Sequence, residues 1–408
     1  MARYTIIVST MDFASINIRD KLFHIGLWER ARGNDRFRVY RQGQFMLVET
    51  DDYHVFHDGI DRELEAMGYK PDAIIFASKH RSKDGRKTLT VHHTGNFGEA
   101  RFGGRSHELA TAAPRVALSL LKNLKFRATG YDISYEATHH GPSDLVTPSV
   151  YVEIGSSETE WKDAGAGEAV ARAILDIKED ADAPVYLGIG GNHYAPRETA
   201  LSLEAGTAFG HIIADHAIPL LTGETLAQAF ERSGTRIAYI DRKSIPADER
   251  RRIEGLLASS GFEAHTESYI RDVALNPVLK CHRLRDLMVW RKLSRPQVSE
   301  KLRESAPRCG SGRCDACPIW AATEINGELL AFSYKLDRDS VLKIFSGAPV
   351  IYFLDNTGRP ASLVVGMDRQ SLDRATAWIT ERCVEILKTR HKIKYDPIEG
   401  MLYVIERR

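Results

Sequence analysis

The chain has 408 residues, 43% hydrophobic and 27% charged, and its 56 Lys and Arg residues against 55 Asp and Glu residues give a formal net charge of +1. This composition is typical of a soluble globular protein of two or three domains, and the charge argues neither for nor against a nucleic-acid partner. No apolar run approaches the ~20 residues of a membrane span, and five cysteines fit a reducing compartment better than a disulfide scaffold. We therefore expect a cytoplasmic, monomeric protein that does not enter a membrane.

Short β-rich runs alternate with longer amphipathic stretches over the first two thirds of the chain. Strands are predicted at Tyr4–Ser9, Phe45–Glu49, Ala73–Ala77, Thr88–His92, Asp132–Glu136, Val150–Ile154, Val185–Ile189 and Arg236–Tyr239. Helices are predicted at Ser15–His24, Val55–Met67, Ala113–Leu124, Ala166–Ile177, Leu226–Glu231 and Ala247–Ser259. This alternation predicts one α/β domain over residues 1–275, a single α/β sandwich with a mostly parallel sheet flanked by helices.

The pattern changes near Asn276-Pro277. Nine basic residues face only three acidic ones between Lys280 and Arg308, and Ser294-Arg295-Pro296 is typical of a helix start, so two basic helices are predicted. Hairpins are then predicted across Ala321–Tyr334, turning at Asn326-Gly327, and across Val350–Val365, turning at Asn356-Thr357-Gly358. A helix over Gln370–Thr389 and a strand over Met401–Ile405 complete a small α+β domain at 276–408.

Four short segments that follow predicted strands carry most of the chemistry. They are His92-His93-Thr94-Gly95-Asn96-Phe97-Gly98, Glu136-Ala137-Thr138-His139-His140-Gly141-Pro142, Glu153-Ile154-Gly155-Ser156-Ser157-Glu158 and Gly190-Gly191-Asn192-His193-Tyr194-Ala195-Pro196. Loops that leave the carboxyl ends of parallel strands converge on one rim, where ligands bind. We therefore expect a reaction site or a metal site at that rim.

A neutral histidine can take a proton from water near pH 7, and a bound metal can acidify water instead. The candidates are His92, His139, His140 and His193, with Glu136, Asp144 and Glu153 as possible ligands or orienting partners. His139 and His140 can share one metal only if the chain leaves strand geometry, as Gly141-Pro142 favours, and we prefer His140 of this pair. Single histidines are more often structural, and His80, His107, His211 and His216 are interpreted that way.

Two further features have a functional and a structural interpretation. Ser156-Ser157 can cap the helix that follows, or can present backbone N–H groups to an oxyanion or phosphate. The basic loop Lys79–Lys87 can be an ordinary solvated surface, or can contact a phosphate backbone through residues such as Lys79 and Arg81. Both interpretations stay open for each feature.

The segments HHTGNFG, YEATHHGPSD, EIGSSETEW and GIGGNHYAPR resemble the archaeal and plant type of D-aminoacyl-tRNA deacylase over about residues 4–267. The resemblance implies hydrolysis of the ester between a D-amino acid and the acceptor end of tRNA, dependence on Zn²⁺, and a fold similar to peptidyl-tRNA hydrolases and purine nucleoside phosphorylases. His93 and Asn192 depart from the family pattern, so no essential role is expected of His93. A carboxylate, Glu136 or Glu153, is expected to hold the substrate ammonium group while the pocket shape rejects the L enantiomer.

The expected residue roles can be stated as three sets. Catalysis is expected of His92, His140, His193 and Glu136. Metal ligation is expected of His92, His139, His140, His193 and Glu153. Substrate contact is expected of Asn96, Asp144, Ser156, Ser157, Tyr194, Lys79 and Arg81.

The cysteines Cys309, Cys314 and Cys317 form a second possible metal site. Their spacing fits a structural zinc, with Cys281 or His282 as a fourth ligand, and it is also similar to plant-type iron–sulfur ligation. A loop of reduced cysteines without metal is the third interpretation, and Cys383 is assigned to a helix core. With basic helices just before it, this domain is expected to help bind tRNA.

Two other functions fit parts of the sequence. A nucleoside phosphorylase or hydrolase on a related sheet would need a purine pocket and phosphate as co-substrate. A non-catalytic tRNA-binding protein would bind tRNA in a salt-sensitive way without cleaving the ester. The histidine-rich segments argue against the second, because simple RNA binding gains little from neutral imidazoles.

Overall fold

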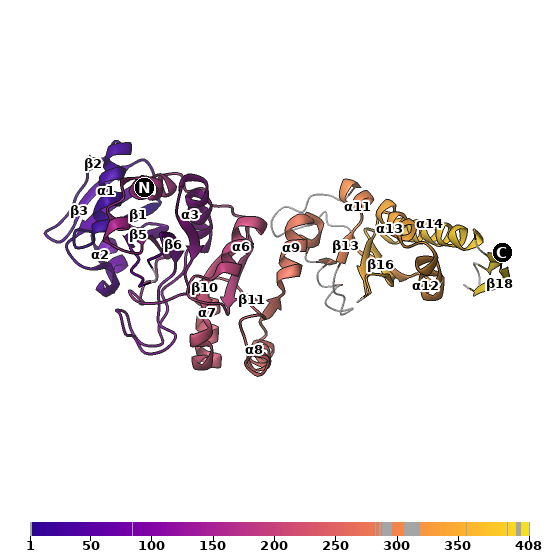
Figure 1. The fold of residues 1–408 in the computed structure, drawn as a ribbon. Coiled ribbons are helices and arrows are strands. Elements are labelled where there is room, and N and C mark those ends of the chain that lie inside the picture. The colour runs from indigo at the N-terminus through magenta and orange to yellow at the C-terminus, as the bar shows by residue number, and fades with distance from the viewer. Residues whose placement is uncertain are drawn as a thin grey trace. The chain divides into compact units, whose positions relative to one another are not determined.

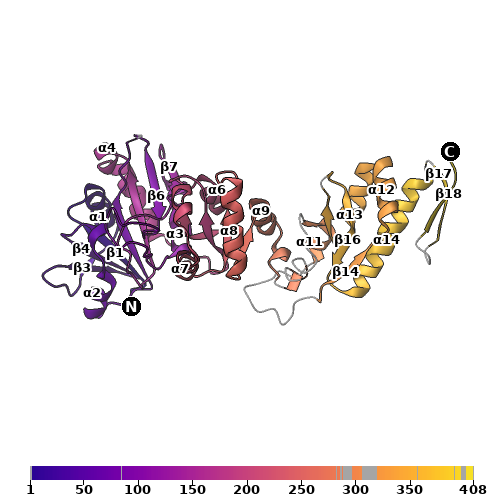
Figure 2. The same ribbon diagram turned by 90° about the horizontal axis from the view of Figure 1, so that it is seen from below.

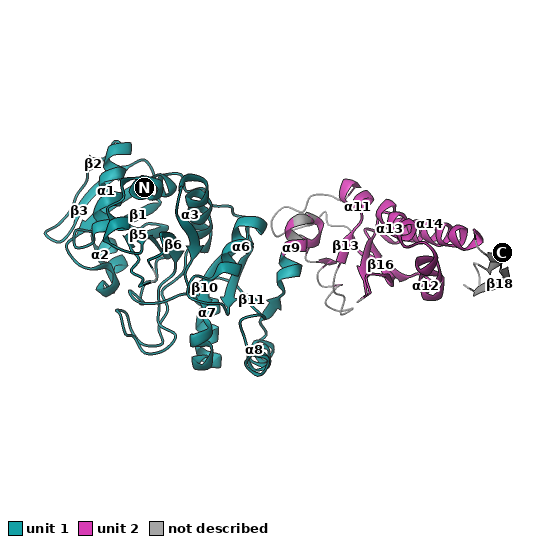
Figure 3. Ribbon diagram, in the orientation of Figure 1, with its two compact units in different colours: residues 1–270 teal, residues 271–408 magenta. Residues whose placement is uncertain are grey.

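The computed structural model (Figures 1 and 2) describes residues 2–83, 85–281, 283, 284, 287, 296–305, 319–355, 357–389, 391–396 and 401–407. The chain divides into two compact units, Met1–Ile270 and Arg271–Arg408 (Figure 3). No helix in these described ranges is long and apolar enough to span a membrane.

The first unit contains an eight-stranded sheet of order β2-β3-β4-β1-β5-β8-β6-β7. Its strands are β1 (Tyr4–Ser9), β2 (Glu29–Arg30), β3 (Arg38–Gln42), β4 (Phe45–Thr50), β5 (Ala73–Lys79), β6 (Thr88–His92), β7 (Asp132–Tyr135) and β8 (Ser149–Gly155). Strands β4, β1, β5 and β8 are parallel to their neighbours in this group. Strands β6 and β7 are parallel to each other, but β6 is antiparallel to β8. At the other edge β3 is antiparallel to both β4 and β2, so only the four central strands form one parallel block.

Both faces of this sheet are covered. The alternation of side chains sends Ile6 and Val8 of β1 to a core shared with α1 (Phe13–Ile25), α3 (Pro114–Arg127) and α5 (Ala164–Leu175). Ile7 and its neighbours on the other face pack against α2 (Ile60–Ala66). Helix α1 begins at Asp12, whose carboxylate accepts hydrogen bonds from the backbone of Ala14 and Ser15.

The first unit also holds a second sheet, of order β10-β9-β11-β12. The predicted α/β class with mostly parallel strands is confirmed, and these strands form two sheets. The parallel strands of the second sheet are β9 (Val185–Ile189), β10 (Ala208–Ile213), β11 (Ile237–Ile240) and β12 (Glu263–His265). The accompanying helices are α4 (Glu158–Trp161), α6 (Pro196–Ala205), α7 (Gly223–Ser233), α8 (Ala247–Ser259) and α9 (Glu267–Leu275), with 3₁₀ turns η1 (His54–Phe56) and η2 (Asp215–Leu220). Periodicity identified most of these strands, but it carries no information on which strands pair.

The second unit is an α+β structure. Its antiparallel sheet has the order β13-β15-β16-β14, and β17 pairs with β18. The elements are η3 (Pro277–Lys280), β13 (Pro296–Val298), α11 (Glu300–Ser305), β14 (Ala321–Glu324), α12 (Gly327–Leu336), α13 (Arg338–Gly347), β15 (Ile351–Leu354), β16 (Pro360–Gly366), α14 (Arg369–Lys388), β17 (His391–Asp396) and β18 (Met401–Arg407). The predicted hairpin of β15 and β16, the long helix α14, the buried position of Cys383 in it and the last strand are confirmed.

Two predictions for this unit are wrong. Asn326-Gly327 does not turn a hairpin, because the Asn326 side chain accepts a hydrogen bond from the Leu329 backbone and begins α12. Pro296 does not start a helix, because it opens β13 and lies opposite Phe353 of β15. Ser294, Arg295, His282 and the three cysteines Cys309, Cys314 and Cys317 lie outside the described residues.

Candidate active site

The histidine-bearing segments meet over one face of the eight-stranded sheet. In the β6–β8 register His92 lies opposite Tyr151 and Thr90 lies opposite Glu153, so all four side chains share this face. The His92 ring stacks on Tyr151 with centroids 5.2 Å apart, and His92 Nε2 lies 3.6 Å from Glu153 Oε2. The expected single rim of parallel strands is therefore wrong, because β6 and β8 run in opposite directions and bring their side chains together across a face.

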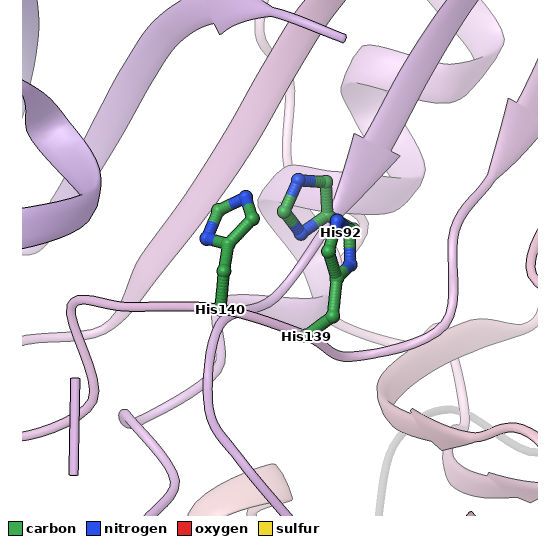
Figure 4. A group of neighbouring side chains, drawn as sticks. All are labelled: His92, His139 and His140. Atoms are coloured by element: carbon green, nitrogen blue, oxygen red, sulfur yellow. The ribbon is translucent and has the colours of Figure 1, made fainter. Parts of the chain in front are cut away.

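His139 and His140 both turn toward His92 (Figure 4). The His139 ring centroid lies 4.4 Å from that of His92, and the His140 centroid lies 4.9 Å from it. His140 has a left-handed backbone, with φ of 46°, which confirms the predicted departure from strand geometry beside Gly141. One ring nitrogen from each of the three histidines lies within 4.8 Å of the others, so the group can hold a metal ion.

The Glu136 carboxylate is buried at the centre of a second group of imidazoles. Its Oε2 lies 3.0 Å from His193 Nε2 and 3.6 Å from His139 Nε2, and its Oε1 lies 3.1 Å from His80 Nδ1. Burial raises the pKa of Glu136, but the His193 and His80 imidazoles outweigh burial and hold this pKa well below its usual range. Glu136 is therefore a fixed negative charge that can orient a histidine or bind a cation.

His193 reaches this group from the second sheet. It follows β9, and its carbonyl oxygen accepts a 2.7 Å hydrogen bond from the backbone N–H of Ala137. The His193 ring stacks with the ring of His80, and the Tyr194 hydroxyl lies 3.2 Å from His80 Nε2. Because the His193 side chain is 38% exposed, it faces the space that a substrate would enter.

The surroundings favour neutral imidazoles at His139 and His140. Burial, together with the neighbouring histidines, lowers the pKa of His139 well below its usual value and that of His140 to about 3. Burial raises the pKa of Glu153, although the neighbouring His92 opposes this. Neutral imidazole is the form that binds a metal.

The donor set also fits a metal. His92 Nε2 is buried, makes no hydrogen bond with any residue that the structure describes, and lies 3.6 Å from Glu153 Oε2. Burial lowers the pKa of His92, but Glu153 outweighs burial and raises it, so a metal bound there would displace a proton. His92 Nδ1 lies 3.2 Å from the His93 carbonyl oxygen, His139 Nδ1 lies 2.8 Å from that of Ala137, and His140 Nδ1 lies 2.7 Å from that of Gly141. Hydrogen bonds at Nδ1 turn Nε2 of each ring inward, as in metal-ligating histidines generally.

A cavity of about 530 Å³ opens onto this cluster. Six of the residues predicted as site residues line it, namely Lys79, Arg81, His139, His140, Glu153 and His193. Side chains that the sequence did not single out line the rest, among them His54, Tyr53, Phe56 and Phe102. This volume lies within the range of small-molecule binding sites in proteins.

Four further residues predicted to contact the substrate form hydrogen bonds within the protein. Asp144 accepts a hydrogen bond from the Gly59 backbone and pairs with Arg62. Asn96 donates to the carbonyl oxygens of Gly103 and Arg105. Ser156 donates to the Arg86 carbonyl oxygen, and Ser157 forms a capping box with Glu160, as its structural interpretation predicted.

The sequence interpretation missed His80, which it assigned a structural role. His80 directly follows β5, as Glu136 follows β7, and this position after a buried strand was the available signal. His54 gave no signal, because it lies in an irregular turn; it is fully buried, and its Nε2 makes no hydrogen bond within the described ranges. His93 lies outside the cluster, with its Nδ1 2.9 Å from the Gly210 carbonyl oxygen and its ring near that of His211.

Comparisons with known proteins agree on one family. The pattern of the family described as D-aminoacyl-tRNA deacylase matches residues 67–265. The D-aminoacyl-tRNA deacylase of Methanococcoides burtonii is 35% identical over 415 residues, which cover 99% of this chain and 86% of that protein. That of Methanosarcina mazei is 43% identical over 281 residues, which cover 66% of this chain and 94% of that protein.

A solved structure supports the same grouping. The crystal structure of a conserved protein of unknown function is 36% identical, covers 66% of this chain and 97% of its own, and aligns with a TM-score of 0.63. The Methanococcoides relative also corrects the expected extent of the similarity, because its alignment includes the C-terminal unit that the sequence resemblance left out.

Proposed function

The chain belongs to the D-aminoacyl-tRNA deacylase family, and from this premise we propose that its ester substrate is cleaved beside the cluster of His92, His139 and His140. The protein is an ester hydrolase that releases free tRNA and a D-amino acid, and so removes D-amino acids mischarged onto tRNA. The observation that carries the location is the meeting of three histidines from two segments, of which His139 and His140 line a cavity large enough for the acceptor end.

We infer that the three clustered histidines bind Zn²⁺. All three donors are imidazole nitrogens, which suit zinc, and a three-histidine set is typical of catalytic zinc sites. A zinc ion held there would supply Lewis-acid activation for the attack of water on the ester. Glu153, expected as a further ligand, lies 3.6 Å from His92 Nε2 and completes an alternative set with His92 and Glu136.

Glu136 and His193 form the proton-transfer pair in this proposal. Glu136 stays ionised and fixes the His193 ring through its Nε2, 3.0 Å away. His193 is the partly exposed member, so it accepts a proton from the attacking water and returns it to the ribose oxygen that leaves. His80 holds the other oxygen of Glu136 and acts as a positioning residue.

Glu153 is our proposed site for the ammonium group of the D-amino acid. It lines the cavity, whereas Glu136 is enclosed by imidazoles. With the ester carbonyl at the histidines and the ammonium group at Glu153, only one enantiomer can direct its side chain away from the sheet. We propose that the side chain of the L form meets the wall of the cavity and that the L form is rejected for this reason.

Contacts to tRNA come from two regions in this proposal. Lys79 and Arg81 line the cavity and can neutralise phosphates next to the terminal nucleotide. The C-terminal unit adds a basic stretch, of which only part is described, and the three cysteines Cys309, Cys314 and Cys317 are proposed to hold a structural zinc. All proposed active-site residues lie within Met1–Ile270 of one chain, so a monomer suffices, working in the cytoplasm where aminoacyl-tRNA is made.

The deciding experiment compares matched D-tyrosyl-tRNA and L-tyrosyl-tRNA as substrates, with and without a chelator. Rapid hydrolysis of the D-ester alone, lost on chelation and restored by Zn²⁺, is the expected result. If the rate of hydrolysis is the same with and without chelator, the reaction needs no metal, and Glu136 and His193 would then carry it out without one. If tRNA binds but neither ester is cleaved, the proposed function is wrong.

A further inference from the structure

Two phenylalanine rings stand open to solvent at the mouth of the active-site cavity. Phe56, at the end of η1, is 62% exposed, and Phe102, in the segment between β6 and α3, is 56% exposed. Their ring centroids lie 5.5 Å apart at an interplanar angle of 65°, and the Phe102 ring lies 6.2 Å from the ring of His140. Exposed aromatic rings that line a cavity indicate a binding surface, because their apolar area is not buried in the core of their own protein and is available to a ligand.

The backbone that carries both rings is fixed. The Phe102 carbonyl oxygen accepts a 3.1 Å hydrogen bond from the Gly141 backbone, next to His140, and Asn96 donates to the carbonyl oxygen of Gly103 at 3.1 Å. Gly103 has a φ of 71°, and a Cβ there would overlap the carbonyl oxygen of Val55, the residue before Phe56. The two segments are therefore held in contact, and the exposed rings are positioned before any ligand binds.

Cations line the same cavity. Lys79 and Arg81 contribute to its wall, and Lys79 Nζ lies 5.5 Å from the centroid of the Tyr53 ring and 5.4 Å from that of Trp161. Aromatic faces beside positive charges are the combination that binds a nucleotide, because the rings stack on the base and the cations meet the phosphate. An amino-acid side chain would use the rings alone, whereas a nucleotide uses the rings for its base and the cations for its phosphate.

We propose that Phe56 and Phe102 form the binding site for the adenine base of the terminal nucleotide of tRNA. This inference rests on the proposed function, in which the ester is attached to the ribose of that nucleotide. With the ester at the histidines, the base lies one ribose away, where the Phe102 ring stands beside His140. Lys79 and Arg81 then face the phosphate on the 5′ side of the same nucleotide. The pair positions substrate and takes no part in the bond cleavage.

The first test measures kcat and KM for D-tyrosyl-tRNA in Phe56→Ala, Phe102→Ala and the double variant. Loss of a stacked base is expected to raise KM roughly tenfold or more while kcat at saturation changes little. Phe102→Trp should keep the KM of the parent chain, whereas Phe102→Leu, equally apolar but without a ring, should not. Phe126→Ala is the matched control, because Phe126 is 85% exposed but lines a different pocket, with Gly165 and Arg172.

A second measurement separates this inference from the proposed function. Binding of adenosine 5′-monophosphate, measured by calorimetry, requires no catalysis and should be lost in the double variant but kept in Phe126→Ala. Equal binding in the parent chain and the double variant would overturn the inference, even if the parent chain deacylates D-tyrosyl-tRNA. If the parent chain does not deacylate but binds the nucleotide through these rings, the inference stands and the proposed function falls. A rise in KM for D-tyrosyl-tRNA that is absent for D-alanyl-tRNA would assign the rings to the amino-acid side chain instead, and would also overturn the inference.

Discussion

His193 Nε2 lies 3.0 Å from Glu136 Oε2, although His193 follows β9 of the four-stranded sheet and Glu136 follows β7 of the eight-stranded sheet. The backbone hydrogen bond from Ala137 to the His193 carbonyl oxygen joins the same two segments. The proposed proton-transfer pair therefore depends on how the two sheets pack within the first unit.

Replacing Glu136 by Gln should lower the single-turnover rate of D-tyrosyl-tRNA hydrolysis by roughly 10²- to 10⁴-fold. The amide keeps the size of the side chain but removes the negative charge that orients His193 and His80. Glu158→Gln is the control, because Glu158 is an exposed residue paired with Lys162. A rate within a few-fold of the parent chain, with an unchanged melting temperature, would remove Glu136 from the mechanism.

Replacing any one of the three clustered histidines, His92, His139 or His140, by Ala should abolish zinc retention at the active site. A catalytic zinc ion usually has three protein ligands, and these three imidazoles would supply all of them. A site with only two imidazoles would therefore bind zinc far more weakly. The measurement is the zinc content after dialysis, by plasma mass spectrometry, compared with His216→Ala, which changes an exposed histidine. Unchanged zinc in all three variants would mean that the metal, if bound, is held elsewhere.

Replacing Glu198 by Gln should stabilise the protein at alkaline pH. Glu198 is fully buried in α6, and burial, together with the charge of Asp241, raises its pKa to about 8. The native state thus keeps a proton that the unfolded chain releases near pH 4.5, so stability is present below that pH and is lost progressively as the pH rises to about 8. The loss at pH 8 should be of the order of a few kcal/mol.

The check on Glu198 is a pair of thermal melts at pH 5 and pH 8.5. The variant should melt near the parent chain at the lower pH and well above it at the higher pH. Glu204→Gln, on the exposed side of the same helix, controls for the general effect of removing a carboxylate. A difference that is equal at both pH values would show that Glu198 is not protonated in the native state.

Truncation after Leu275 should weaken tRNA binding more than it lowers kcat at saturating substrate. The Methanosarcina mazei relative aligns with only 66% of this chain but with 94% of its own length, so members of this family exist without a comparable extension. Removing a basic stretch should also flatten the dependence of the dissociation constant on salt. Filter binding of uncharged tRNA at several salt concentrations measures both effects, and an unchanged dissociation constant would exclude a role of the C-terminal unit in tRNA binding.

The local patterns predicted most helices and strands of the first unit correctly. Strands such as β1, β6 and β9 are short apolar runs whose bounds follow from composition alone, and α8 begins and ends where its amphipathic pattern does. Asn326-Gly327 misled because an Asn side chain caps a helix as readily as it turns a hairpin. The dipeptide Asn-Gly alone does not reveal whether the chain forms a hairpin turn or begins a helix there.

The sequence by itself determined which residues we propose to carry the chemistry, because they stand in segments whose composition has no simple structural explanation. These residues are His92, Glu136, His139, His140 and His193. Tertiary structure alone decided how they meet. Local sequence patterns do not reveal strand direction, so the antiparallel pairing of β6 and β8 could not be predicted. This pairing places His92 beside Glu153 on one face of the sheet. The same holds for His80, which became a partner of Glu136 only because β5 and β7, far apart in sequence, end over the same cluster.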